Sequence, residues 1–428
     1  MPLKIGIAGL GTVGGGALKI LGEHAQMIAA RAGRPVVITA ISARDKTKDR
    51  GAFARALRWV DDPMSMATDP DIDVVVELIG GSEGIAKSLV EKSLEAGKSV
   101  VTANKALIAH HGVQLAALAE KHGVVLAFEA AVAGGVPIIK ALRDGLAANR
   151  FTRVVGIING SCNYILTHMQ NDGVAFDVMM KKAHELGYLE ADPSFDIDGI
   201  DAAHKIAILA SLAFGSAPAI DKVYAEGIRH VSLRDITFAK ELGCRIKLLA
   251  IATHTERGIE QRVHPALVPV SSPLANVNDS YNMVMVEGDH VGTVFFEGRG
   301  AGAGPTGSSV VADIMDIARG VHYKPFTLPV AQLTRGRFIA MEQCRTSYYV
   351  RLSVADQPGV LADITAKLSA EKISMKAFLQ HPHQPGEAVQ LVLTTHETEE
   401  SSMLRAIAAI AKLGSVKEKP YMIRMESN

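Results

Sequence analysis

A glycine-rich turn near the N-terminus restricts the possible folds of this chain more than any other segment. It follows an apolar run, residues 3–8, and precedes a helical pattern of leucines and isoleucines. Gly9 permits a tight turn, Gly11 lets the backbone come close to a ligand, and Gly14 lets the helix pack on the strand. Because a helix N-terminus attracts phosphate groups, this order predicts a bound dinucleotide. The residues expected to contact it are Gly9, Gly11, Thr12, Val13 and Gly14.

Apolar runs and helical patterns alternate through the first third of the chain. The expected strands are residues 3–8, 36–41, 74–79, 99–102 and 124–128, and the clearest helical patterns are residues 84–96 and 106–121. Strands that alternate with helices form a parallel sheet with right-handed crossovers. We therefore expect a Rossmann-type, doubly wound α/β domain over residues 1–130, to which the chain returns at about residues 308–340.

The middle of the chain, residues 131–307, has a mixed character. Strand-like patterns occur at residues 154–158 and near Leu248, Val263 and Val284, and helical patterns occur at residues 165–170 and 201–214. This mixture predicts an α+β domain, to which we assign substrate binding, catalysis and dimerisation. Glycines crowd residues 298–307, which argues against a regular element there and predicts a close approach of backbone to ligand. A helix is expected after them, over residues 308–319.

A separate C-terminal module is expected at residues 347–428, after a polar linker without periodicity at residues 340–346. The module opens with a strand pattern and a loop that contains Asp356 and Gly359, and a helical pattern follows over residues 360–369. The remaining patterns read strand, strand, helix and strand. That order is typical of a small ferredoxin-like α/β sandwich.

Composition and charge exclude several classes of function. The 428 residues include 45 Lys plus Arg and 45 Asp plus Glu, so no net field attracts nucleic acid or an anionic membrane. The three cysteines lack paired spacing, which argues against disulfides and against a zinc site. No apolar stretch reaches membrane-spanning length. We expect a cytoplasmic protein with small-molecule partners, which binds neither nucleic acid nor a membrane.

The end of the second expected strand bears on the choice of cofactor. An enzyme specific for NAD usually places an acidic residue there, on the ribose diol. This chain has Arg44, whose charge can meet the 2′-phosphate of NADP, followed by Asp45, which can still serve a ribose. We expect NADP(H) to be preferred and NAD(H) to be usable. Arg44 as a solvated loop charge is the alternative.

The segment of residues 183–205 carries many acids and few bases. Asp201 and Lys205 stand four residues apart where a helical pattern begins, so their side chains share one face. Reduction of an aldehyde needs a hydride from a nicotinamide and a proton for the developing alkoxide, which a lysine can deliver. An ordinary surface ion pair between the two residues is the alternative.

The same segment resembles the signature of the homoserine dehydrogenases. It contains an alanine, a glycine, an aromatic residue, Asp-Pro, Asp, Gly, Asp and Lys at the spacing of that family. The resemblance extends from the Gly9 turn through residues 102–105, 129–137, 159–166 and the Gly300 region, over nearly the whole chain. It implies the reversible, NAD(P)H-dependent reduction of L-aspartate 4-semialdehyde to L-homoserine, a step in threonine, methionine and isoleucine biosynthesis.

The resemblance also implies roles for individual residues. Lys205 takes the place of the family's proton donor and acceptor, and Lys105 takes the place of a second active-site lysine that also borders the cofactor. The residues that match the substrate-binding acids are Glu190, Asp201 and Asp196. Gly187 and Gly302 match glycines that line the cofactor.

A bound cation and a regulatory ligand are implied in the same way. Residues 129–136 resemble the loop in which the family holds a monovalent cation, taken to be sodium, which oxygen ligands suit. The implied ligands are the Glu129 carboxylate and the carbonyls of Val132, Gly134 and Val136; a plain glycine-rich connection is the alternative. Residues 350–364 resemble the opening of an ACT domain, which implies feedback regulation with threonine as the effector, whereas a module that only dimerises is the alternative. We expect a homodimer or homotetramer.

Two other functions stay open at this point. Cys162 lies between small polar residues, as the nucleophile of a phosphorylating semialdehyde dehydrogenase does, although no histidine is clearly assigned to pair with it. A catalytically inactive metabolite sensor is the other reading. The presence of both lysines and of the acids argues against a sensor.

Overall fold

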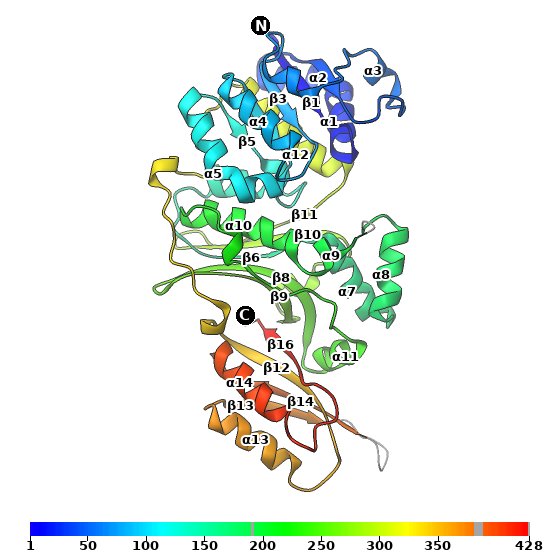
Figure 1. The fold of residues 1–428 in the computed structure, drawn as a ribbon, viewed down its shortest axis with the longest axis vertical. Helices are drawn as coiled ribbons and strands as arrows, with labels where there is room; N and C mark the ends of the chain where they lie inside the picture. The colour runs from blue at the N-terminus through cyan, green and yellow to red at the C-terminus, as the bar shows by residue number, and fades with distance from the viewer. Residues whose placement is uncertain (190–191, 381–387, 427–428) are drawn as a thin grey trace.

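The computed structural model describes residues 1–189, 192–380 and 388–426. The molecule is elongated, with a nucleotide-binding type of sheet at one end, a second sheet in the middle and the C-terminal module at the other end (Figure 1). Short 3-10 or π turns connect the larger elements: η1 (Pro63–Ala67), η2 (Glu129–Ala131), η3 (Ala141–Gly145), η4 (Ile220–Lys222), η5 (Pro273–Asn276), η6 (Val330–Gln332) and η7 (Met341–Gln343). Among the described residues, no helix has both the length and the apolar character that a membrane span requires.

The N-terminal sheet is parallel, with the strand order β2-β1-β3-β4-β5. Its strands are β1 (Leu3–Ala8), β2 (Val36–Ser42), β3 (Val74–Glu77), β4 (Ser99–Thr102) and β5 (Leu126–Ala127). The helices are α1 (Thr12–Glu23), α2 (Ala25–Ala32), α3 (Gly51–Arg55), α4 (Ile85–Glu95) and α5 (Lys105–His122). This arrangement confirms the predicted doubly wound sheet. The strand order reverses between β1 and β3, and ligands bind outside the carboxyl ends of the strands at such a point.

The glycine-dense segment forms the start of a helix, which corrects one expectation. Helix α12 (Ala303–Ala318) begins within residues 298–307, which we expected to be irregular. It packs against α1 at very short range: a Cβ at Gly16 would lie 1.9 Å from a carbonyl oxygen of α12, and a Cβ at Gly307 would lie 2.8 Å from the Ala17 nitrogen. The close packing of two helices therefore accounts for glycine inside α12.

The central sheet continues into the C-terminal module. Its first five strands, in the order β11-β10-β6-β8-β9, are antiparallel. They are β6 (Phe151–Ile157), β8 (Cys244–Thr255), β9 (Gly258–Pro269), β10 (Tyr281–Gly288) and β11 (Gly292–Arg299), with the short strand β7 (Tyr224–Ala225) beside β9. The helices of this region are α6 (Ile138–Lys140), α7 (Gly160–Asp172), α8 (Phe176–Glu185), α9 (Ser194–Ile197), α10 (Ile200–Phe214) and α11 (Leu233–Glu241).

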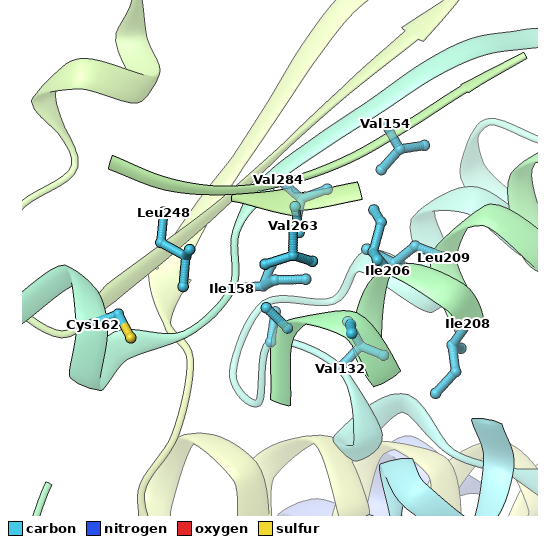
Figure 2. Close-up of a cluster of buried hydrophobic side chains, with 14 of the residues drawn as sticks. Val132, Val154, Ile158, Cys162, Ile206, Ile208, Leu209, Leu248, Val263 and Val284 are labelled. Atoms are coloured by element: carbon cyan, nitrogen blue, oxygen red, sulfur yellow. The ribbon is translucent and has the colours of Figure 1, made fainter. Parts of the chain in front are cut away.

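Helix α10 is fixed to the sheet by an apolar core. Its Ile206 and Leu209 lie in the same buried cluster as Val154, Val263 and Val284 of the strands (Figure 2). All five side chains are fully buried. Full burial of one such side chain stabilises the folded state by about 1.5–3 kcal/mol. The helix therefore has a defined position over the sheet.

The C-terminal module has the predicted ferredoxin-like order. Its elements are β12 (Arg345–Val354), α13 (Val360–Ala370), β13 (Met375–Gln380), β14 (Val389–Thr395), β15 (Thr398–Glu399), α14 (Glu400–Ile410) and β16 (Tyr421–Met425). Strand β16 pairs with β12 on one side and, in parallel, with β9 on the other, through Arg424 opposite Ala266 and Met425 opposite Leu267. One continuous sheet therefore joins the module to the central region, a contact that the sequence did not predict. Residues 340–346 are not a simple polar linker, because Met341 and Cys344 are buried and β12 begins at Arg345.

Candidate active site

Polar side chains from four segments meet between the two sheets. Asp201 and Lys205 lie one turn apart on α10, as their spacing predicts, and α10 lies between the sheets (Figure 1). Gly199, with a φ of 81°, precedes α10 and places Asp201 in its first turn. The partial positive charge of a helix N-terminus favours an ionised carboxylate there.

The Asp201 carboxylate binds both lysines. Its Oδ2 accepts a hydrogen bond from Lys205 Nζ at 2.7 Å, and its Oδ1 lies 3.2 Å from Lys105 Nζ. Asn159 Nδ2 donates to Oδ2 at 2.9 Å. Burial opposes the ionisation of Asp201, but the charges of the two lysines and these hydrogen bonds outweigh it and hold the pKa of Asp201 well below its usual range. Asp201 is therefore a fixed negative charge that brings two ammonium groups together.

Asp196 is a second carboxylate with the opposite character. Burial, followed by the negative charge of Asp201, raises the pKa of Asp196 above its usual value. Asn159 Nδ2 donates to Asp196 Oδ1 at 2.7 Å, so one side-chain amide links the two carboxylates. The sequence did not single out Asn159, although it stands directly between a strand and a helix and caps α7 by accepting from the Cys162 N–H at 2.8 Å.

Lys205 has an oriented ammonium group. It donates to the Ile158 carbonyl oxygen and to Asp201, each at 2.7 Å, and its side chain is 12% exposed. An ammonium has three N–H groups, so among the described residues one of them remains for another acceptor. The two hydrogen bonds fix the orientation of the ammonium and so set the direction of its third N–H. Proton transfer to a substrate oxygen needs an oriented donor of this kind.

Lys105 reaches this cluster from the nucleotide-binding sheet. It begins α5 directly after β4, and Asn104 caps that helix by accepting from the Leu107 N–H at 3.1 Å. The Lys105 ammonium lies 5.4 Å from the centre of the Phe195 ring. Nothing in the local sequence of Lys105 indicates that it meets Asp201, since the two residues lie in helices that are far apart in the chain. Glu190, expected to bind substrate, lies outside the described residues.

The glycine turn has the geometry that a pyrophosphate requires. Gly9 has a φ of 101°, and a Cβ there would lie 2.3 Å from the Leu78 carbonyl oxygen. A Cβ at Gly14 would lie 2.0 Å from the Gly9 carbonyl oxygen, so glycine is needed at both positions. Gly11 and Thr12 are exposed and Val13 is half-buried at the N-terminus of α1, where backbone N–H groups face a ligand.

The other two predicted cofactor glycines lie outside this turn. Gly302, with a φ of 119°, precedes α12, which packs on α1. Gly187, with a φ of 75°, is exposed after α8. Both positions have the positive φ that favours glycine.

A basic pocket lies beside the glycine turn. It has a volume of about 630 Å³, and the residues that carry its charge and its aromatic wall are Lys46, Lys48, Asp49, Arg50, Arg55 and Trp59. Arg50 Nε lies 3.5 Å from the Leu10 carbonyl oxygen, which places this side chain next to the turn. Arg44 is exposed and does not line the pocket, and Asp45 Oδ1 accepts hydrogen bonds from the backbone N–H and the hydroxyl of Thr47.

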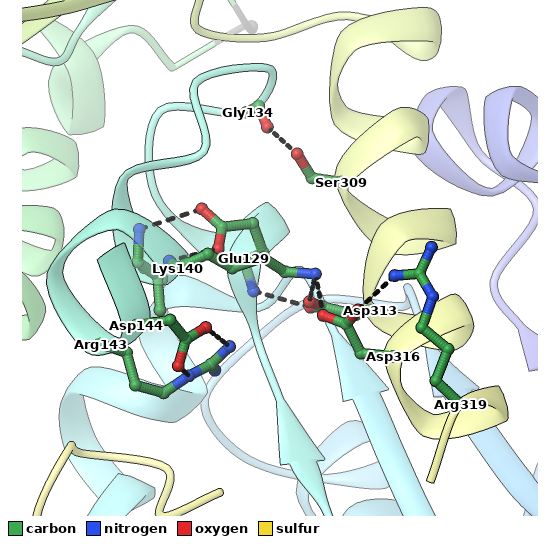
Figure 3. A network of polar contacts seen from close by, with 10 residues as sticks. Glu129, Gly134, Lys140, Arg143, Asp144, Ser309, Asp313, Asp316 and Arg319 are labelled. Carbon is green, nitrogen blue, oxygen red and sulfur yellow. Dashed lines mark hydrogen bonds and ion pairs between the residues drawn. The ribbon is translucent and has the colours of Figure 1, made fainter. Parts of the chain in front are cut away.

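The loop expected to hold a cation is tightly built around Glu129. The two Glu129 carboxylate oxygens accept from the backbone N–H groups of Ile139, at 3.0 Å, and Lys140, at 2.7 Å. The Gly134 carbonyl accepts from Ser309 Oγ at 2.6 Å (Figure 3). Val132 and Val136 are buried. Burial, together with the nearby Asp313, raises the pKa of Glu129 to about 7.

Two further carboxylates lie near Glu129 and share one lysine. Lys140 Nζ lies 3.1 Å from Asp313 Oδ1 and also pairs with Asp316, so this lysine is committed to two carboxylates (Figure 3). A buried carboxyl with a raised pKa is one that a neighbouring positive charge would stabilise in its ionised form. In the described part of the chain, no group of three or more His, Cys, Asp or Glu side chains is placed to hold a metal ion.

Cys162 is unsuited to nucleophilic catalysis. Its side chain is fully buried in the apolar core (Figure 2), and its Sγ donates to the Asp196 carbonyl oxygen at 3.3 Å. Burial, followed by the nearby carboxylates, raises the pKa of the thiol well above its usual value. A thiolate is the reactive form of cysteine, so this environment does not favour the phosphorylating dehydrogenase.

Family models match the chain in three consecutive segments. The model for the NAD-binding domain of homoserine dehydrogenase matches residues 9–129, the homoserine dehydrogenase model matches residues 137–315, and the ACT domain model matches residues 348–415. All three matches agree with the order of the folded regions.

Relatives match the chain over its full length. A homoserine dehydrogenase from Neisseria gonorrhoeae is 48% identical over 432 residues, which cover 100% of this chain and 99% of that protein. The crystal structure of a homoserine dehydrogenase from Thiobacillus denitrificans has a TM-score of 0.94 at 46% identity and covers 100% of this chain and 98% of that one. A Staphylococcus aureus homoserine dehydrogenase structure at pH 8.5 has a TM-score of 0.77 at 30% identity, with coverage of 100% and 99%.

Proposed function

This chain belongs to the homoserine dehydrogenase family, and on that basis we propose how its own residues carry out the interconversion of L-homoserine and L-aspartate 4-semialdehyde. The observation that carries the proposal is the Asp201 carboxylate, which holds Lys105 and Lys205 together at the edge of the nucleotide-binding sheet. When bound, the nicotinamide cofactor supplies or accepts the hydride.

Lys205 transfers the proton. Its third N–H donates to the substrate oxygen, delivers the proton as an alkoxide develops in aldehyde reduction, and takes it back in alcohol oxidation. Lys105 adds a second positive charge on the same side of the site. Homoserine-dependent appearance of the reduced nicotinamide absorbance tests the reaction, and no turnover with either NADP or NAD would contradict it.

The acids bind the amino-acid end of the substrate. Because Asp201 is already occupied by two lysines, Asp196 is the better placed of the two to accept from the substrate ammonium. Glu190 is assigned to the same end by the resemblance of its segment. With this division, the chain separates residues that hold the substrate from residues that move its proton.

NADP(H) is the preferred cofactor, with NAD(H) usable. The support is the basic pocket beside the glycine turn, where Arg50 and its neighbours offer charge to a 2′-phosphate. Gly9, Gly11, Thr12, Val13 and Gly14 take the pyrophosphate, and Gly187, Gly302 and Lys105 border the cofactor.

The variant Arg50→Gln tests this preference. Loss of one charge-assisted hydrogen bond to the 2′-phosphate raises KM for NADP by about tenfold and leaves KM for NAD nearly unchanged. Arg44→Gln is the matched control, because Arg44 is exposed and outside the pocket. Steady-state kinetics with both cofactors decide the matter: equal effects of Arg50→Gln on the two KM values, or a larger NADP effect for Arg44→Gln, would contradict the role of the pocket.

A monovalent cation, taken as sodium, binds at the Glu129 loop. The burial of the Glu129 carboxyl next to Asp313 supports it, and the carbonyls of Val132, Gly134 and Val136 would complete an oxygen ligand set of the kind a hard cation prefers. In the chain, this loop connects the last strand of the nucleotide-binding sheet to α6, so an ion there would brace the boundary between the two regions.

Glu129 makes the stability of the protein depend on pH. Without a cation, the folded state keeps a proton on this carboxyl up to a pKa of about 7, against a reference value of 4.5. The unfolded state releases that proton earlier, so the free energy of unfolding falls by about 3 kcal/mol as pH rises from 4.5 to 7. Urea unfolding in tetramethylammonium chloride shows this fall, sodium chloride at equal ionic strength reduces it, and Glu129→Gln lacks it. If the free energy of unfolding depended on pH equally in wild type and Glu129→Gln, the assignment of this dependence to Glu129 would be wrong.

The C-terminal module gives the enzyme a regulatory site, and threonine is the proposed effector. The support is the ACT match at residues 348–415 and the loop before α13, where Gly359 has a φ of 90°.

The chain self-associates as a homodimer or homotetramer. The exposed apolar side chains at and beside the edge strand β11 favour this association: Tyr281, Val291 and Phe295. We place the protein in the cytoplasm and divide it into domains at residues 1–130 with a return at about 308–340, 131–307 and 347–428. Addition of threonine to the turnover assay tests the regulatory site, and light scattering of the purified chain tests the self-association.

A further inference from the structure

A short segment connects the C-terminal module to the acids of the active site. Residues 224–229, here called the coupling segment, include β7 and lie beside β9. On one side the segment meets Arg424 of the module, and on the other it meets residues 194–199, here called the acidic loop, which carry Asp196.

Arg424 of β16 grips the coupling segment from the module. Its Nη1 donates to Glu226 Oε2 at 2.6 Å, and its Nη2 donates to the Tyr224 hydroxyl at 3.2 Å. The guanidinium also pairs with Glu400 of α14, through Nε at 3.0 Å. The Arg424 side chain is 3% exposed, and Glu226 is 29% exposed. A buried guanidinium that donates through all three of its nitrogens holds its partners in one geometry.

The other end of the coupling segment lies directly on the acidic loop. A Cβ at Gly227 would lie 2.0 Å from the Ile197 carbonyl oxygen, and the Ile228 N–H donates to that same oxygen at 3.0 Å. Arg229 Nη2 donates to Asp198 Oδ2 at 3.0 Å and to Ser194 Oγ at 3.1 Å. The contact combines a close backbone approach at Gly227 and Ile228 with the side-chain hydrogen bonds of Arg229, so a shift of the segment is transmitted to the loop.

Glu226 stands where the two contacts join. Its N–H donates to the Val263 carbonyl oxygen of β9 at 2.8 Å, and the Val263 side chain lies 3.0 Å from the position of a Cβ at Gly199, the residue before α10. Its carboxylate is the point that Arg424 holds. From the acidic loop, Asn159 then links Asp196 to Asp201.

We propose that Glu226 is a positioning residue of the active site, through which Arg424 of the C-terminal module sets the place of Asp196. This inference rests on the proposed role of Asp196 in binding the substrate ammonium. The proposal also says how a ligand of the module regulates substrate binding. A ligand that displaces β16 or Arg424 moves the coupling segment, and the coupling segment moves the acidic loop that carries Asp196.

The variant Glu226→Ala tests the proposal in the full chain. Arg424 keeps Glu400 as its partner, so no buried charge is left alone. KM for homoserine rises about tenfold while kcat changes less than twofold, as expected when only substrate positioning is lost. Glu226→Gln, which retains an oxygen for Arg424, lies between Glu226→Ala and wild type. Hydrogen exchange of a peptide covering residues 194–203 becomes faster in Glu226→Ala.

The matched control is Glu426→Ala. Glu426 also pairs across the boundary of the module, with Arg153 of β6, but it does not touch the coupling segment. It leaves KM and the exchange of residues 194–203 as in wild type. Equal effects of the two alanine variants, or a wild-type KM in Glu226→Ala, would overturn the proposal. If Asp196→Ala left KM for homoserine as in wild type, the proposed role of Asp196 in substrate binding would fail instead, so the two failures are distinguishable.

Discussion

Replacement of Lys205 by alanine lowers kcat for homoserine oxidation by about 10³-fold, within the range that a positioned proton donor contributes. The variant removes the ammonium that is fixed by both Asp201 and the Ile158 carbonyl oxygen, while Asp196, which accepts from Asn159, remains to bind the substrate. KM for homoserine therefore changes little. Steady-state kinetics in the oxidative direction measure both quantities.

Lys205→Arg serves as the control for charge. The guanidinium keeps the positive charge but does not give up its proton at working pH, so its kcat stays within about tenfold of the alanine variant. A kcat close to wild type in Lys205→Arg would show that charge alone is needed and that another group transfers the proton. A large rise in KM with unchanged kcat in Lys205→Ala would show that Lys205 only binds substrate.

The variant Asp201→Asn affects both activity and stability. It leaves Lys105 and Lys205 close together without the carboxylate that neutralises them, and Asp201 is only 5% exposed. Breaking a buried ion pair in this way costs about 3 kcal/mol of unfolding free energy. Because the folded-state pKa of Asp201 is lowered, its contribution is present above the reference value of 3.8 and is lost as pH falls below it.

Urea unfolding and kinetics together measure these effects. The stability difference between wild type and Asp201→Asn is constant near neutral pH and shrinks in acid, and kcat falls by about 10²-fold or more because Lys205 loses its orientation. Asp71→Asn is the control, since Asp71 pairs with the exposed Lys4 at 2.7 Å and its loss leaves stability and activity as in wild type. Equal stability of Asp201→Asn and wild type at pH 7 would contradict the proposed stabilisation by the ion pairs of Asp201 with Lys105 and Lys205.

The local parts of the fold and of the site were predictable from the sequence. The glycine turn, the parallel strands and the pair formed by Asp201 and Lys205 depend on spacings of a few residues, which the sequence displays directly. The role of Lys105 came from resemblance to a family, because no local pattern shows that the first residue of α5 meets α10.

The contacts that the sequence did not predict are those between distant segments. Pairing of β16 with β9 brings Arg424 to Glu226, which stands 198 residues earlier in the chain. Helix α12 starts earlier than we expected because it packs closely on α1. The glycines of residues 298–307 are compatible with such packing, but the sequence does not indicate which helix they pack against. The basic pocket gathers residues around Trp59 from several turns of the chain, and the single position after the second strand, Arg44, does not indicate these neighbours.

The most direct test of the central claim is the absorbance of reduced nicotinamide when homoserine and NADP are added to the wild-type chain and to Cys162→Ser, with and without phosphate. The account predicts turnover in both proteins that does not require phosphate, since the Cys162 thiol is buried against the Asp196 carbonyl. No turnover of homoserine, together with a phosphate-dependent oxidation of aspartate 4-semialdehyde that Cys162→Ser loses, would contradict it.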